Sequence, residues 1–109
     1  MRLHLLSMTQ TLVAGALGLA AAPVAAQDAA ALRIKALAAT CANCHGTLGH
    51  AVEGAAVPGL AGMPAVYMVE QLKAFKAGSR PATVMHQLAK GYNDAQIDQI
   101  AAYFAAQKK

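Results

Sequence analysis

The sequence predicts an all-α fold of about four helices, and three observations support this prediction. Apolar residues recur at spacings of three and four in several segments, as they do along one face of a helix. Proline, glycine and asparagine stand at the ends of these segments, where helices begin and end. No strand-like run surrounds the central cysteine pair, and the chain has no internal repeat.

The N-terminus has the features of a secretory signal peptide. Arg2 and His4 form a short basic region, an apolar run covers 12–22, and small residues lead up to Ala26. The run is shorter than the about 20 apolar residues of a transmembrane helix. We therefore expect residues 1–26 to be removed on export, and 27–109 to form a domain without a membrane span. In a Gram-negative cell this domain would be periplasmic.

Residues 27–109 are enough for one domain, at a size where a hydrophobic core alone gives marginal stability. Without Arg2, eight basic residues stand against five acidic ones, a net charge of about +3. Nucleic-acid binding is not expected, because such proteins cluster Lys and Arg more densely. The large apolar side chains expected in the core are few: Leu32, Ile34, Leu37, Leu60, Leu72, Phe75, Leu88, Ile97, Ile100 and Phe104.

The first two elements are a helix over 29–40 and a long loop over 46–63. Leu32, Ala36 and Leu37 share one face of the helix, which leads directly into the cysteine pair. The loop is rich in glycine, alanine and proline and shows little periodicity. A loop of this length in a compact domain is usually functional, and here it is expected to wrap around a bound group.

The remaining elements are a helix over 64–77, a turn, a short segment over 82–90, and a closing helix from Asp94 to about 107. Proline suits the start of the first of these helices, and glycine suits the position just past its end. Asn93 and Gln96 have the spacing of a capping box. The expected buried face of the closing helix consists of Ile97, Ile100, Ala101 and Phe104.

The chemistry of the chain centres on Cys41-Ala42-Asn43-Cys44-His45. This C-x-x-C-H spacing is the attachment signature of c-type haem. Each thiol adds across one haem vinyl group to form a thioether, and the histidine that follows ligates the iron. We therefore predict one haem c bound covalently through Cys41 and Cys44, with His45 as an axial ligand.

Two other uses of a cysteine pair are less consistent with the sequence. A thiol redox motif is expected within a βαβ unit, which is absent around these residues. A zinc site needs four ligands, and no second Cys/His cluster follows at a suitable spacing.

The order of motifs resembles the class I cytochromes c over essentially all of 27–109. The resemblance extends from Cys41–Gly46 through Val57-Pro58-Gly59-Leu60-Ala61-Gly62 to the closing Ile100-Ala101-Ala102-Tyr103-Phe104. Residues 67–80 are most similar to a bacterial branch that holds the periplasmic two-haem cytochromes and the cytochrome subunit of flavocytochrome c sulfide dehydrogenase. Only one C-x-x-C-H is present, so a two-haem arrangement would need a second chain.

The resemblance implies further contacts of the haem site. The first and last helices should cross, with Ala36 or Ala39 against Tyr103 or Phe104. The carbonyl of Pro58 should accept a hydrogen bond from the second ring nitrogen of His45, which fixes the ring and raises its basicity.

The sixth ligand has five candidates: Met63, Met68, Met85, His50 and His86. His50 follows the motif too closely to pass around the ring, and Met68 lies on an apolar helix stripe where methionine usually fills a core. The family places its axial methionine in the segment before the closing helix, so Met85 is preferred. Spacing alone leaves His86 and Met63 as alternatives.

These features predict a monohaem carrier of single electrons, which is not itself expected to be an enzyme. The alternative is the haem subunit of a sulfide dehydrogenase, which accepts electrons from a flavoprotein partner. A gas-binding or peroxidase-like protein would need an open distal site, which the methionines argue against. Arg80 is a candidate partner of a haem propionate. Four basic residues have two possible interpretations, as ordinary charges on the surface or as a basic face that docks a partner: Lys73, Lys76, Arg80 and Lys90.

Overall fold

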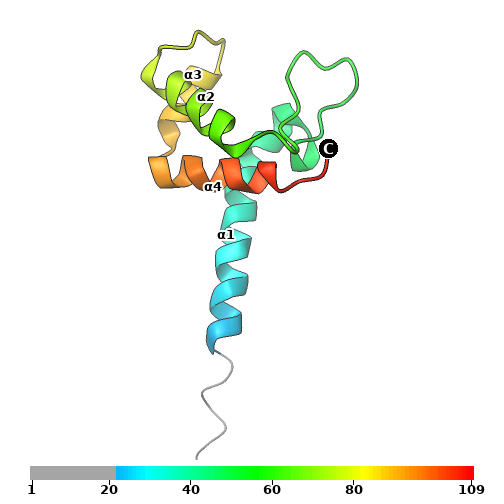
Figure 1. Cartoon of the computed structure of the whole chain (residues 1–109), viewed down its shortest axis with the longest axis vertical. Coiled ribbons are helices and arrows are strands. Elements are labelled where there is room, and N and C mark those ends of the chain that lie inside the picture. The colour runs from blue at the N-terminus through cyan, green and yellow to red at the C-terminus, as the bar shows by residue number, and fades with distance from the viewer. Residues whose placement is uncertain (1–21) are drawn as a thin grey trace, which may run out of the picture.

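The computed structural model describes residues 22–109 of the chain (Figure 1). This part is helical and contains no strand, which confirms the all-α prediction. Its elements are α1 (Ala22–His45), η1 (Thr47–Gly49), α2 (Ala65–Ala77), α3 (Met85–Leu88), η2 (Ala89–Gly91) and α4 (Asp94–Ala105), where η marks a single 3-10 turn. Helix α4 packs against both α1 and α2, and the core lies at this crossing.

Helix α1 is longer at both ends than the expected helix over 29–40. Its alanine-rich sequence has a high helix propensity, so the helix starts well before it meets the other elements. This early part extends away from the body of the domain (Figure 1), and Leu32 is 67% exposed. The expectation that Leu32 belongs to the core is therefore wrong. At the other end the helix continues through the cysteine pair and ends at His45.

Helix α4 supplies the largest part of the core. The predicted capping box is present: the Asn93 side chain accepts from the Gln96 backbone N–H, and the Gln96 side chain accepts from the Asn93 backbone N–H. The predicted buried face is also confirmed: Ile97, Ile100, Ala101 and Phe104 are buried. The helix ends at Ala105, two residues before the expected end.

The crossing of α1 and α4 uses an alanine different from the two that were expected. Ala38 is the buried alanine of α1 and belongs to the same core cluster as Phe104. Ala36 and Ala39 are exposed, although Ala39 borders a small hollow that Tyr103 also lines. The small side chain still serves its expected purpose, since it lets the two helices approach closely.

Helix α2 begins at Ala65, directly after Pro64, and ends at Ala77, with Gly78 as its C-cap residue. Gly78 has φ +77, the left-handed conformation that glycine adopts most readily after a helix. Met68 and Leu72 are its buried residues. Leu88 of α3 is 51% exposed, so its expected place in the core is wrong, because the four residues of α3 are too few to form a continuous buried face.

Most of the predicted signal peptide, residues 1–21, lies outside the described part of the chain. Residues 22–26 form the start of α1. None of the described helices combines the length and the apolar character needed to cross a bilayer.

Candidate haem site

The two cysteines lie on the last turns of α1, three residues apart, so their side chains share one face of the helix. Cys41 is half-buried against the core, whereas Cys44 is exposed, and they do not form a disulfide. Burial raises the pKa of the Cys41 thiol, as does the neighbouring Cys44 to a smaller extent, while a hydrogen bond with Thr40 lowers it. Helix α1 thus presents both sulfur atoms on the same side.

His45 is the only buried polar residue among those described, with 9% exposure. Its Nδ1 lies 2.7 Å from the carbonyl oxygen of Pro58, which can only accept a hydrogen bond. Nδ1 must therefore carry the proton and donate it. In the neutral imidazole this leaves Nε2 with a free lone pair, the state in which histidine ligates a metal.

The loop after α1 holds Pro58 in place through glycines. Gly46 ends the helix with φ +86, and a Cβ at this position would lie 1.9 Å from the carbonyl oxygen of His50. The carbonyl of Gly49 then accepts two backbone hydrogen bonds, from Leu60 at 2.8 Å and from Ala61 at 3.1 Å. These bonds fold the far half of the loop back over its start, so that Pro58 reaches the His45 ring.

The five candidates for the sixth ligand occupy different environments. Met68 is 4% exposed within the core, and His50 is exposed in the loop that follows His45. Met63 and Met85 are half-buried and pack against the core. His86 is half-buried, and its Nδ1 is a buried atom without a hydrogen-bond partner among the described residues.

Arg80 is exposed, and its side chain lies along α2. Its guanidinium stacks over the Phe75 ring, 4.5 Å from the centroid, and donates to the Gln71 side-chain carbonyl. Other guanidinium N–H groups stay available for an anion.

The lysines near Arg80 carry partly compensated charge. Lys73 and Lys76 lie 3.8 and 3.2 Å from the carboxylate of Asp94. The positive charge around these residues is therefore smaller than the sequence alone suggests.

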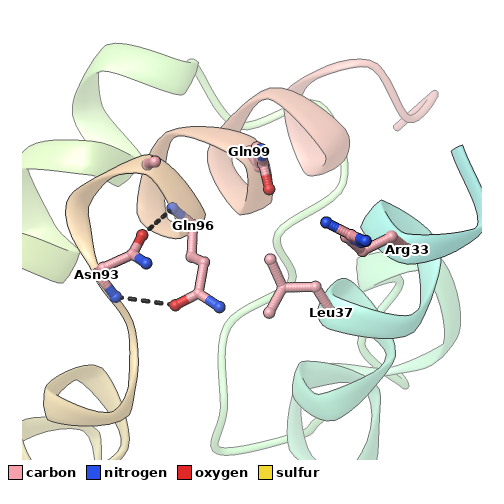
Figure 2. A pocket seen from close by; sticks show the side chains of 6 residues that line it. Arg33, Leu37, Asn93, Gln96 and Gln99 are labelled. Atoms are coloured by element: carbon pink, nitrogen blue, oxygen red, sulfur yellow. Dashed lines mark hydrogen bonds between the residues drawn. The ribbon is translucent and has the colours of Figure 1, made fainter. Parts of the chain in front are cut away.

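A hollow of about 380 Å³ lies elsewhere on the described surface, between α1 and the start of α4 (Figure 2). Arg33 and Leu37 line one side, and Asn93, Ala95, Gln96 and Gln99 line the other. The side-chain oxygens of Asn93 and Gln96 accept the two hydrogen bonds of the capping box, as the dashed lines in Figure 2 show. This hollow does not include the cysteines or Met85 and is not part of the haem site.

The described residues fit a haem and not a cluster-type metal site. No three His, Cys, Asp or Glu side chains within 22–109 converge to hold an ion. Instead, two thiols share a helix face, a buried imidazole keeps Nε2 free, and thioether candidates lie on other elements. This is the donor set that c-type haem requires.

The sequence did not single out Thr40 and Tyr92. The Tyr92 hydroxyl lies 2.7 Å from the Thr40 hydroxyl, directly before Cys41. These residues are 52 positions apart, and neither belongs to the attachment motif, so spacing gave no signal for the pair.

Comparison with known proteins agrees with this donor set. The family model for cytochrome c matches residues 31–108. The chain is 43% identical over 68 residues to the cytochrome subunit of sulfide dehydrogenase from Chlorobaculum tepidum, covering 62% of this chain and 60% of that protein. It is 38% identical over 72 residues to cytochrome c-554(548) from Halomonas halodenitrificans, covering 63% of this chain and 86% of that protein.

A third relative is the thiosulfate dehydrogenase electron acceptor from Thiomonas intermedia, which is 39% identical over 71 residues. That match covers 65% of this chain and 33% of the relative. The chain therefore spans between a third and three fifths of the length of two of these curated relatives. Together with the attachment motif, the family match establishes that the chain belongs to the cytochrome c family and carries one haem c bound covalently through Cys41 and Cys44.

Proposed function

We propose that the chain is a monohaem electron carrier in which His45 and Met85 are the axial ligands of the iron. When bound, haem c supplies reversible one-electron chemistry. The observation that carries the proposal is the hydrogen bond from His45 Nδ1 to the Pro58 carbonyl, because it leaves Nε2 free for the iron. The two thiols beside it hold the haem covalently in a domain with a small core.

Met85 is the preferred sixth ligand, since it is half-buried against the core on a segment separate from the loop that supports His45. Met68 is committed to the core, and Met63 lies on the His45 side of the fold, at the end of the same loop. The main alternative is His86, whose unpaired buried Nδ1 shows that the imidazole is not fully satisfied by the described protein groups.

With His45 and Met85 both bound to it, the haem iron would have no free position for a substrate, and no acid/base group is needed to pass one electron. A gas-binding or peroxidase-like function would require the distal position to be open. The haem would gain or lose one electron at a time. The partners of this chain would therefore be other redox proteins, which dock near the haem edge. Thioether ligation favours ferrous iron more than a second histidine would, which raises the reduction potential.

The test is the visible spectrum of the haem-loaded protein, oxidised and reduced, for the wild type, Met85→Ala and His86→Ala. We expect sharp c-type bands and a weak long-wavelength iron–sulfur band that is lost in Met85→Ala and kept in His86→Ala. A wild type without this band would indicate His86 ligation or an open site. If Met85→Ala keeps the band, the ligand is Met63 instead.

A second candidate function is the haem subunit of a sulfide dehydrogenase. The 43% identity to the cytochrome subunit of such an enzyme favours it, and the partner would then be a flavoprotein that carries the sulfide chemistry. Purification from the native source distinguishes the two functions. Copurifying flavin together with sulfide-dependent haem reduction supports the subunit, whereas a flavin-free protein supports the free carrier.

Export to the periplasm belongs to the same proposal. The basic start, the apolar run and the small residues before Gln27 support cleavage after Ala26. Thioether attachment outside the cytoplasm would require such export. N-terminal sequencing of the protein from a periplasmic fraction should begin at Gln27, and an uncleaved N-terminus would contradict this.

Arg80 is proposed to pair with a haem propionate. The stacking on Phe75 and the bond to Gln71 hold the guanidinium in one position and leave other donors free. Arg80→Ala should then change both the reduction potential and the stability of the loaded protein, and unchanged values would end the idea.

A further inference from the structure

Residues 82–92 form the segment that bears Met85, and Tyr92 joins the end of this segment to α1 and α2. Tyr92 lies just after η2 and shortly before α4. Its backbone carbonyl accepts a hydrogen bond from Lys76 Nζ of α2 at 2.7 Å, and its hydroxyl lies 2.7 Å from the Thr40 hydroxyl of α1. Thr40 directly precedes Cys41, so this contact reaches the point where the haem is attached.

The direction of the hydroxyl contact follows from the neighbouring bond. Thr40 has one hydroxyl hydrogen, and its oxygen lies 2.8 Å from the carbonyl oxygen of Leu37, which can only accept. Thr40 therefore donates to Leu37, and Tyr92 donates to Thr40. The Cys41 sulfur is 3.9 Å from the same oxygen, but a thioether sulfur has no hydrogen to donate. The pair thus acts by position and not through a bond to the sulfur.

Burial holds the Met85-bearing segment only weakly. Between positions 82 and 92, Ala89 is the only buried residue, while Val84 and Leu88 are more than half exposed. A segment with few buried apolar contacts opens at a low free-energy cost. The bonds made by Tyr92 therefore add to the packing of Met85 and Tyr92 against the core in holding the segment closed.

We propose that Tyr92 is a positioning residue that, through Thr40, holds Met85 in place as the axial ligand. This inference rests on the proposed His45/Met85 ligation. In the folded protein the Tyr92–Thr40 bond fixes the end of the segment to the helix that bears the haem. Loss of the bond raises the population of the open form, in which Met85 has left the iron, without altering the closed form.

Imidazole is a suitable probe, because it binds the iron only when the sixth ligand has left. Its affinity for the oxidised, haem-loaded protein is measured by the loss of the long-wavelength iron–sulfur band. Tyr92→Phe removes the hydroxyl and keeps the ring, and Thr40→Val keeps the side-chain shape and similar helix propensity. Each should raise the imidazole affinity about two- to tenfold, the effect of one exposed hydrogen bond, with the band position unchanged.

The double variant and two controls separate positioning from general stability. The imidazole affinity of the double variant, Tyr92→Phe with Thr40→Val, should be about the same as that of either single variant, because both substitutions remove the same bond. Tyr103→Phe deletes a hydroxyl near the other end of α4, and Ile100→Val destabilises the core at a fully buried position. Neither control should change the imidazole affinity.

The results distinguish this inference from the function on which it rests. A wild type without the iron–sulfur band would overturn the Met85 ligation. If the wild type shows the band, the positioning role is overturned by wild-type imidazole affinity in both single variants. It is equally overturned by effects that add in the double variant, or by an equal increase in Ile100→Val.

Discussion

The loop that supports His45 and the segment that carries Met85 lie at opposite ends of α4 and are held in different ways (Figure 1). Glycines with left-handed φ and paired backbone hydrogen bonds fix the loop, which is tied to α4 by a bond from Gly62 to Phe104 at 2.9 Å. Hydrogen bonds to Tyr92 from the side chains of other helices hold the segment, in which Val84 and Leu88 are more than half exposed. This contrast underlies our proposal that the site opens on the Met85 side and not on the His45 side.

The largest loss of stability is expected from Gly46→Ala, a substitution in the loop that supports His45. The new Cβ would lie 1.9 Å from a backbone carbonyl oxygen, and alanine is also strained at φ +86. We expect the free energy of unfolding of the haem-loaded protein to fall by more than about 2 kcal/mol, or loading to fail. Denaturant unfolding and the yield of haem protein measure these effects.

Gly54→Ala is the matched control, because Gly54 has φ +78 but nothing within 4 Å of its Cβ position. It carries the conformational cost alone, about 1 kcal/mol. Equal losses in the two variants would show that packing at Gly46 does not fix the loop.

A smaller effect is expected from Asn93→Ala at the boundary between the Met85-bearing segment and α4. The substitution removes the bond that the Asn93 side chain accepts from the Gln96 backbone N–H. It should lower the free energy of unfolding by about 1 kcal/mol. Because Tyr92 keeps its own bonds, the imidazole affinity should rise less than in Tyr92→Phe. A larger rise would mean that the cap, and not the tyrosine, holds the segment.

The same contrast explains what could be predicted from the sequence. The attachment motif, the capping box and the buried face of α4 depend on residues a few positions apart, so local patterns revealed them. The bond between Pro58 and His45 is present as the family resemblance implied. The exposure of Leu32 could not be foreseen, because it depends on how far α1 extends past its neighbours. The Tyr92–Thr40 bond joins distant positions outside any motif.

The smallest effect is expected from Asp94→Asn, which separates the two roles of Lys76. The ion pairs of Asp94 are largely exposed, so the loss of stability should stay below about 1 kcal/mol and shrink in high salt. Lys76 would still donate to the Tyr92 carbonyl, so the imidazole affinity should not change. Lys76→Met removes both interactions and should raise that affinity. If Asp94→Asn raises it as much, the ion pair holds the segment in place and the bond to the carbonyl does not.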